Sequence, residues 1–302
     1  MKKHVPIIFA AISLVLIVTI LITVPSPNAS ISRPPPVEQM QSVLHFDSTA
    51  ALLRHFEETA YVWPINKVAS IPDTLIRSMP NDIHTIKDVK TRKSVFIRVM
   101  LPIILSEQKR IRNNRQTLKL ALQSEPGNTT LGDKLNGLFS EYNINENWDF
   151  PKKRKSLLHR FDELPLTLIL AQAAIESGWG TSRFTRLGNS LFGEWTYKTN
   201  EGIIPKGRDA GKTHRIKTFP SLRDSIASYI KNINRNKAYR ELRQLRAEMR
   251  EKHQALDAKK LASGLQRYSQ KGQAYVDTIL AILNSTEFKL IETLNLDTHL
   301  RL

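Results

Sequence analysis

The chain alternates between amphipathic stretches of helical spacing and short segments rich in turn residues. From Asp88 onward, apolar residues recur at helical spacing to about Ala121 and predict a long helix, in which Pro102 predicts a kink or an interruption. A turn at residues 125–128 ends it, and Leu131 to Tyr142 predicts a shorter helix. The pattern of the first half is therefore mainly helical.

The second half begins with a helix of core character and then changes its pattern. Pro165 suits the first turn of a helix whose apolar face carries small alanines. Residues 195–219 have the composition of a β-hairpin, and a helix capped by Ser221 follows. The stretch from Tyr239 to Lys260 is rich in Arg, Lys and Glu, which predicts a solvated helical face. We expect a mainly α (α+β) fold.

An uncharged, nearly all-aliphatic run extends from Val5 to Val24, directly after Lys2 and Lys3. Its length suits one crossing of a bilayer, for which about 20 residues are needed. We favour an uncleaved signal anchor over a cleaved signal peptide, because the run is longer than a typical cleavable segment and its exit lacks a small-x-small site. The preceding lysines place the remainder outside the cytoplasm, in the periplasm of a bacterial cell.

The composition excludes cysteine chemistry and favours one kind of binding partner. The 302 residues include no cysteine, which excludes disulfides, cysteine nucleophiles and thiolate metal sites. The 45 Lys and Arg against 28 Asp and Glu leave a net charge of +17, which favours a polyanionic partner. Because an exported domain meets cell wall and lipid rather than nucleic acid, we expect no nucleic-acid partner.

Pro34, Pro35 and Pro36 indicate a semi-rigid spacer after the apolar run. The resulting organisation has five parts: a transmembrane signal anchor (1–25), a linker and irregular segment (26–87), a helical extension (88–150), a catalytic domain (151–290) and a tail (291–302).

Glu176 stands out chemically, because it occupies the last turn of the helix that begins at Pro165 and is followed by Gly178, Trp179 and Gly180. The helix macrodipole disfavours negative charge at this end, and the indole and apolar face partly desolvate the group. Both effects raise the carboxyl pKa. A protonated carboxyl near neutral pH is what cleavage of a glycosidic bond requires.

The run from Ala171 to Gly180, followed by Gly188-Asn189-Ser190-Leu191-Phe192-Gly193, closely resembles the signature of glycoside hydrolase family 73. The resemblance covers roughly residues 157–288, and it implies a lysozyme-like helical domain with a small β-hairpin lobe. It also implies an endo-β-N-acetylglucosaminidase that acts on peptidoglycan glycan strands.

The resemblance carries the role of general acid to Glu176. Trp179 either stacks on a sugar or packs beneath the acid, with packing favoured, and Asn189 either fixes its loop or bonds a sugar amide. Phe192 is interpreted as packing more than as a ligand contact. Trp195 is a candidate for the cleft. The expected substrate-binding residues are thus Trp179, Asn189, Phe192, Glu194 and Trp195.

The second carboxylate is expected in the hairpin. Glu201, which precedes Gly202, is nearest to the family's position and is the preferred candidate, with Glu194 and Asp209 as alternatives. Tyr268 takes the role of the family's tyrosine that faces the acid, whereas Tyr275 is expected to pack the final helix against the core.

No metal or other cofactor is expected, since the eight histidines are scattered without a metal-binding spacing. Ser177 lacks the Gly-x-Ser-x-Gly elbow of a serine hydrolase. The predicted partners are therefore glycan strands and, through the N-terminal helix, the cytoplasmic membrane, and we expect a monomer. The alternatives are a cell-wall amidase, a muramidase, and a non-catalytic protein that binds the wall.

Overall fold

The computed structural model describes residues 42–65, 71–125, 127, 129–198, 201–208 and 211–299. The predicted signal anchor, residues 1–25, lies outside these residues. Within the ranges that the structure describes, none of the helices combines the length and the apolar composition needed to cross a bilayer.

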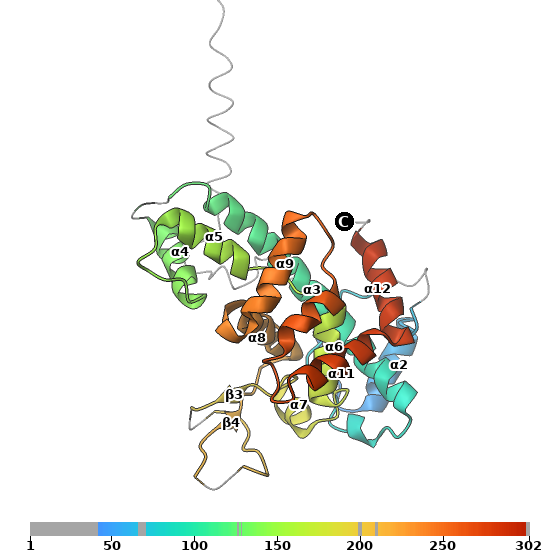
Figure 1. Cartoon of the computed structure of the whole chain (residues 1–302). Helices are drawn as coiled ribbons and strands as arrows, with labels where there is room; N and C mark the ends of the chain where they lie inside the picture. Colours follow the sequence, from blue (N-terminus) through green and yellow to red (C-terminus); the bar gives the residue numbers. More distant parts are fainter. Residues whose placement is uncertain are drawn as a thin grey trace, which may run out of the picture.

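Helices dominate the described chain (Figure 1), with two pairs of very short strands. The α-helices are α2 (Thr49–Glu58), α3 (Val89–Ala121), α4 (Thr130–Glu141), α5 (Phe150–Arg160), α6 (Leu166–Ser177), α7 (Arg183–Gly188), α8 (Leu222–Arg235), α9 (Arg240–Glu251), α10 (Ala258–Ala262), α11 (Gln273–Leu283) and α12 (Thr286–His299). Single 3₁₀ turns are η2 (Ile83–Thr85), η3 (Lys237–Tyr239) and η4 (Ser263–Leu265). The strands are β1 (Val43–Leu44), β2 (Leu75–Ile76), β3 (Trp195–Thr196) and β4 (Arg215–Ile216). The predicted mainly helical class is thus confirmed for these residues.

The long helix α3 begins as predicted, because the Asp88 carboxylate accepts the Thr91 backbone N–H at 2.7 Å. The sequence predicted a kink or an interruption at Pro102; the helix is not interrupted there, and α3 continues through the proline. Leu101 and Ile103 on either side are buried, so the packing of α3 compensates for the hydrogen bond that proline removes.

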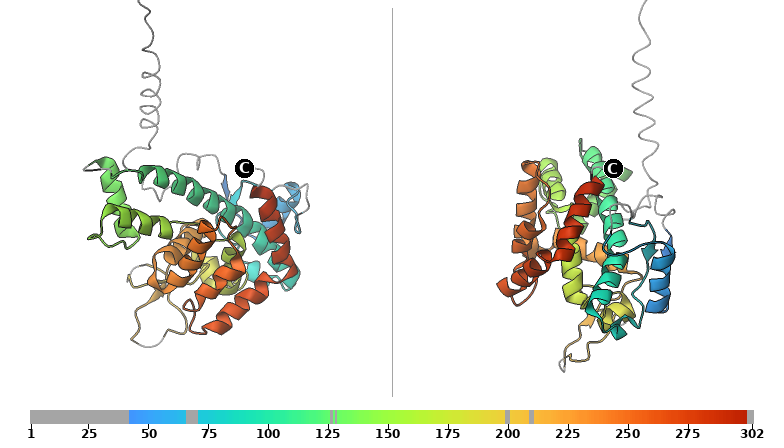
Figure 2. Two further views of the ribbon diagram at one scale, coloured as in Figure 1. Left: turned by 45° about the horizontal axis from the view of Figure 1, so that its top comes forward. Right: turned by 90° about the vertical axis from the view of Figure 1, so that its right-hand side faces the viewer.

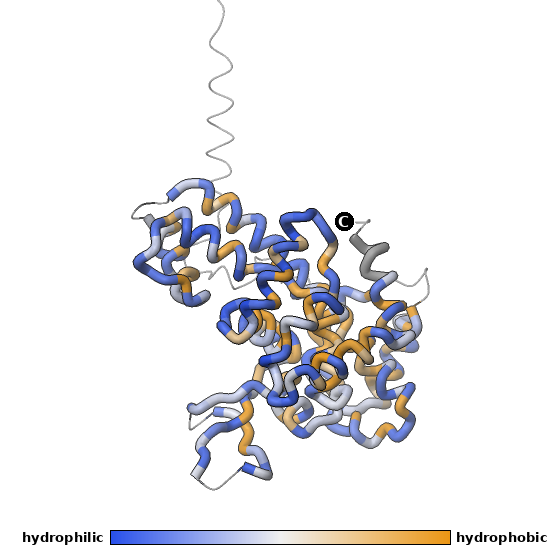
Figure 3. The backbone as a smooth tube through the Cα atoms, in the orientation of Figure 1, coloured by the Kyte–Doolittle hydropathy of each residue, from blue (hydrophilic) through white to orange (hydrophobic). Residues whose placement is uncertain are grey.

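The centre of the molecule is α6, which packs against α3, α10, α11 and α12. Its residues from Leu168 to Ala171 are fully buried, and the orange colour that marks hydrophobic residues is concentrated in this region (Figure 3). An apolar helix without a polar face is stable only when neighbours surround it. The last turn of α6 is consequently held by the core on several sides.

Two segments of the predicted organisation contain elements that the sequence did not predict. Part of the segment 26–87, expected to be irregular, is folded: Leu52 and Phe56 of α2 are buried, and β1 pairs in parallel with β2. In the second segment, residues 291–302, α12 runs to His299, and Ile291 is buried. In both places the apolar residues are too few to predict an element from the sequence alone. They are buried because they pack against the core.

The strands β3 and β4 pair antiparallel with Trp195 opposite Ile216, and Ile203 adds a further bridge to Ile216. This confirms the predicted hairpin. Both views of Figure 2 show it projecting from the helical body. We refer to residues 195–198, 201–208 and 211–216 as the β-lobe.

The prediction of a solvated face for residues 239–260 is wrong for two of the arginines in α9. Arg243 and Arg246 are buried, and Arg246 donates to the backbone oxygens of Asp162, Glu163 and His159 at 3.0–3.2 Å. A guanidinium group with several donors can satisfy carbonyls that a helix end leaves unpaired. Arg246 thereby fixes the segment that leads from α5 into α6.

Candidate active site

Glu176 lies in the last turn of α6, where the backbone turns sharply. Gly178 caps the helix in the left-handed conformation with φ = 58°, and Gly180 has φ = 80°. A Cβ added at Gly180 would lie 2.9 Å from Met79 Cε and 3.1 Å from Phe96 Cδ2. Gly180 is therefore required for conformation and for close packing against α3.

Ser177 and Trp179, the neighbours of Gly178 in the sequence, hold this turn in place. Ser177 is fully buried, donates to the Ala173 oxygen at 2.5 Å, and accepts the Gly180 N–H at 2.9 Å. Trp179 also has positive φ, 58°, an uncommon conformation for a bulky residue. Its ring lies edge-on to Phe96 and Phe288, so the structure places it in the packing role of the two considered.

A chain of directed hydrogen bonds ends at Glu176. The Tyr229 hydroxyl donates to Gln172 Oε1, Gln172 Nε2 donates to the Tyr275 hydroxyl at 3.1 Å, and that hydroxyl donates to Glu176 Oε1 at 2.7 Å. Each donor in the chain points toward the carboxyl group. In the described residues no donor contacts the other oxygen, Oε2, which leaves it available to a ligand.

The environment of Glu176 raises the pKa of its carboxyl above the ordinary value, chiefly because burial penalises the charged form. The hydrogen bond from Tyr275 and the positive charge of Lys271 act in the opposite direction. The raised pKa agrees with the direction expected from the helix end and the adjacent indole. The group is suited to carry a proton at a pH where an exposed glutamate would be ionised.

Four tyrosines surround this carboxyl. Tyr268 stacks on Tyr275 with ring centroids 5.2 Å apart and lies 5.9 Å from Tyr239 and 6.4 Å from Tyr229. The Tyr268 hydroxyl makes no hydrogen bond to Glu176 within the described residues; the Tyr275 hydroxyl does. Tyr275 is packed as expected, but the prediction that packing is its role was incomplete.

Glu194 lies at the base of the β-lobe and interacts with one of the same tyrosines, Tyr239. Its Oε2 accepts from the Ser228 hydroxyl at 2.8 Å and lies 3.9 Å from Lys217 Nζ, which itself contacts Ser228 Oγ at 3.0 Å. Burial raises the pKa of Glu194, and these two partners oppose the shift. The negative charges of both Glu194 and Glu176 raise the pKa of Tyr239, which places both carboxyls near one buried ring.

The preferred candidate, Glu201, is placed differently. Its side chain is 56% exposed and pairs with Lys198 at 3.0 Å on the surface of the β-lobe. The third candidate, Asp209, lies outside the described residues. Of the hairpin acids that the structure describes, Glu194 is the one that shares a tyrosine neighbour, Tyr239, with Glu176.

The remaining predicted residues divide between support and surface. Asn189 is buried and fixes its loop, because its Nδ2 donates to the Phe219 oxygen at 3.1 Å. Phe192 stacks on Tyr229 at 4.0 Å, which agrees with packing. Trp195 is 60% exposed and stacks on His214 at 4.3 Å, and it offers an aromatic face on the β-lobe.

Among the described residues, no group of three or more His, Cys, Asp or Glu side chains is arranged to hold a metal ion. The available chemistry is that of two partly buried carboxyls with hydroxyl and ammonium partners. Such a pair can donate a proton and stabilise positive charge, which is the chemistry that hydrolysis of a glycosidic bond uses.

Comparison with known proteins agrees with this chemistry. A family model described as "Mannosyl-glycoprotein endo-beta-N-acetylglucosaminidase", the Glucosaminidase family, matches residues 152–288. The chain is also 28% identical to "Protein bax" of Escherichia coli (strain K12) over 224 residues, which cover 73% of this chain and 76% of that protein. No solved structure matches it.

The class that these findings support is a glycoside hydrolase, since residues 152–288 match the glucosaminidase model. The match to the glucosaminidase model over residues 152–288 and the similarity to Protein bax over most of the chain support a Bax-like protein of the glycoside hydrolase family 73 group.

Sequence reasoning missed three polar contacts of the two carboxyls: Gln172, Ser228 and Lys217. Gln172 carried a readable signal, because it is a polar residue inside an apolar helix and lies one turn before Glu176. Ser228 carried none, since only the packing of α8 brings it to Glu194. Lys217 lies opposite Glu194 in the hairpin, where its N–H donates to the Glu194 backbone oxygen at 2.7 Å, a register that composition alone does not give.

Proposed function

We propose that this protein hydrolyses the β-1,4 bond on the reducing side of N-acetylglucosamine in peptidoglycan, with Glu176 as the general acid. The observation that carries the proposal is the placement of Glu176. Its carboxyl has a raised pKa, one oxygen held by Tyr275, and the other oxygen without a donor among the described residues. The match to the glucosaminidase family supports the class of reaction.

In this proposal Glu176 Oε2 carries the proton to the leaving oxygen as positive charge develops on the sugar. The hydrogen bond to Oε1 keeps the carboxyl in one orientation, which lowers the entropy lost on reaching the transition state. Tyr275 and, behind it, Gln172 act as positioning residues, because each donates along the chain that ends at Glu176.

We assign the second carboxylate to Glu194 instead of Glu201. Glu194 has a cation 3.9 Å away and a hydroxyl donor at 2.8 Å, both of which stabilise its ionised form. Glu176 has no ion pair of this kind in the described chain. Two carboxyls with different partners can hold different charges at one pH. In this proposal Glu176 is the protonated acid and Glu194 is the anion.

The positive charge of the chain supports an anionic wall polymer as the substrate. We further propose that residues 5–24 anchor the protein in the cytoplasmic membrane with the catalytic domain in the periplasm, on the basis of their uncharged composition and the lysines before them. Protease added to spheroplasts should digest the catalytic domain, while protection of the domain in intact spheroplasts would contradict this orientation.

Product analysis tests the assigned bond. Purified peptidoglycan is digested with the protein, the fragments are reduced with borohydride, and mass spectrometry identifies the reduced sugar. The proposal predicts fragments that end in reduced N-acetylglucosamine. Reduced N-acetylmuramic acid would indicate a muramidase, and release of peptides without new reducing sugars would indicate an amidase.

A further inference from the structure

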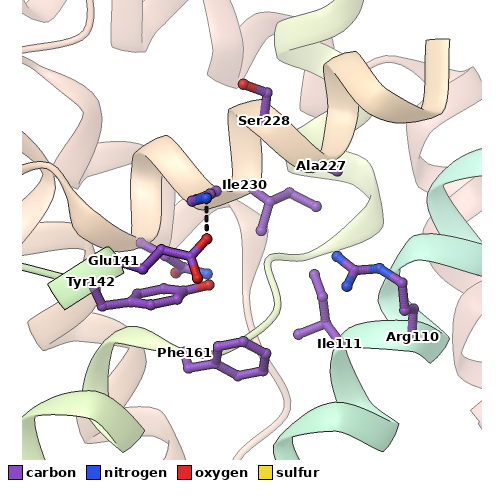
Figure 4. A pocket seen from close by; sticks show the side chains of 10 residues that line it. Arg110, Ile111, Glu141, Tyr142, Phe161, Ala227, Ser228 and Ile230 are labelled. Carbon is purple, nitrogen blue, oxygen red and sulfur yellow. Dashed lines mark ion pairs between the residues drawn. The ribbon is translucent and has the colours of Figure 1, made fainter. Parts of the chain in front are cut away.

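A pocket of about 250 Å³ lies against α8 (Figure 4). Its walls come from α3, from the end of α4, from Phe161 after α5, and from α8. We call it the α8 pocket. Four of its ten lining residues, Arg110, Ile111, Glu141 and Tyr142, precede residue 152, where the match to the glucosaminidase family begins. The helical extension therefore builds part of a site that the family domain alone does not form.

The pocket combines an apolar floor with opposite charges. Ile111, Phe161 and Ile230 supply the floor. Glu141 and Lys231 form an ion pair on one side of it, and Arg110 lies on the other side (Figure 4). A ligand that fits this arrangement has an aliphatic part together with carboxylate and ammonium groups. A uniformly anionic polymer does not fit, since Glu141 would repel it.

The aromatic residues of the pocket argue against a sugar ligand. Tyr142 and Phe161 are 7% and 4% exposed, and their rings pack on one another with centroids 5.5 Å apart. Their faces are thus covered, whereas a sugar stacks on an open face such as that of Trp195. A short peptide matches the lining better, because its side chains are aliphatic and its ends and acidic residues are charged.

The position of the pocket links it to the proposed reaction. Ser228 lines the pocket, and its hydroxyl is directed away from the other lining side chains, where it donates to Glu194 Oε2 at 2.8 Å. A ligand in the pocket is therefore separated from the second carboxylate by one residue of α8. Peptidoglycan strands carry short peptide branches with free carboxylate and amino groups, and a strand bound at Glu194 presents such branches nearby.

We propose that the α8 pocket binds the peptide branch of peptidoglycan, with a peptide carboxylate at Lys231 and a peptide ammonium at Glu141. The inference rests on the proposed function and adds to it that the preferred substrate bears peptides. Lys231 and Glu141 are 40% and 23% exposed, so exchanging their mutual ion pair for pairs with the ligand costs little. Arg110 stays paired with Glu107 and contributes positive potential.

The kinetic test compares two substrates: soluble glycan strands with their peptides, and the same strands after an amidase has removed the peptides. We expect the wild-type protein to cleave the peptide-bearing strands with a kcat/KM about tenfold higher, as one or two charge-assisted contacts provide. In Lys231→Gln and Glu141→Gln this ratio should fall toward one, while cleavage of peptide-free strands is unchanged. Equal rates on both substrates in the wild type, or an unchanged ratio in both variants, would overturn the proposal.

Lys109→Gln is the matched control, because Lys109 is exposed on α3 beside Arg110, does not line the pocket, and carries the same charge. It should retain the wild-type ratio. Thermal melting of each variant checks that the fold is intact.

A binding measurement separates this proposal from the proposed function. Calorimetry with the free peptides released by the amidase should give binding to the wild type and to Lys109→Gln, and at least a tenfold weaker affinity in Lys231→Gln. Failure of the wild type to cleave either strand would contradict the proposed function alone, whereas absence of peptide binding at millimolar concentration would contradict the pocket assignment alone.

Discussion

The two carboxyls at the proposed site are held by different kinds of structure. Glu176 ends a helix that is buried on all sides, and its partners Gln172, Tyr229 and Tyr275 come from three helices of the core. Glu194 lies at the root of a hairpin that projects from the body, with Ser228 and the partly exposed Lys217 as partners. The comparison suggests that the acid is positioned by the core and that its partner is positioned by the seam between α8 and the β-lobe.

The largest effect is expected at the acid itself. Glu176→Gln retains the shape of the side chain and its acceptor for Tyr275, but it has no proton to donate to a leaving oxygen. We expect kcat on peptidoglycan to fall about 10³-fold, within the range for general acid catalysis. Turbidity loss of purified peptidoglycan measures this rate, and clearing at the wild-type rate would remove Glu176 from the chemistry.

A matched pair of substitutions tests which hairpin acid works with Glu176. Glu194→Gln should lower kcat about 10²-fold, because the site loses a buried negative charge near the developing cation. Glu201→Gln removes an exposed ion pair with Lys198 and should change the rate less than twofold. The reverse order of effects would restore Glu201 as the second carboxylate, and it would show that the β-lobe moves when glycan binds.

Tyr275→Phe tests the hydrogen bond to the acid, with Tyr268→Phe as its control. The Tyr275 hydroxyl lowers the pKa of Glu176 against the effect of burial, so its removal raises that pKa further. Since the acid must be protonated, the decline of activity at high pH should move to higher pH. The loss of orientation should lower kcat about tenfold. Tyr268→Phe should leave the pH profile in place; a shift in that variant only would assign the family's tyrosine role to Tyr268.

The smallest effect concerns the exposed cation beside Glu194. Lys217 lowers the pKa of Glu194, so Lys217→Met should raise it. If Glu194 acts as an anion, activity at low pH is lost at a higher pH than in the wild type, by a small shift because the pair is partly exposed. The acidic limb of the kcat profile measures the shift, and movement toward lower pH would contradict the anionic role.

The sequence predicted the acid better than its partners, and the reason is physical. Glu176, its glycines and Trp179 are neighbours in the chain, so helix rules and one motif were enough to interpret them. Glu194 and Ser228 are 34 positions apart, and only tertiary packing brings them together. The same limit explains the buried Arg246, whose five hydrogen-bond partners lie on segments that charge periodicity along α9 does not reveal.

The fold shows the same division. Helices with strong periodicity and a cap, such as α3 after Asp88 and α8 after Ser221, were predicted within one or two residues. The short α2 and the strands β1 and β2 were missed, because two-residue strands have no periodicity to read and depend on contacts with the core.

The central claim, that Glu176 donates a proton to the leaving group, is tested most directly by changing the leaving group. In a 2,4-dinitrophenyl β-glycoside of an N-acetylglucosamine oligosaccharide, the leaving group is 2,4-dinitrophenolate, which departs without being protonated. The account predicts that Glu176→Gln loses about 10³-fold in kcat on glycan strands but less than about tenfold on this substrate. An equal loss on both substrates would mean that Glu176 has a role other than that of the acid.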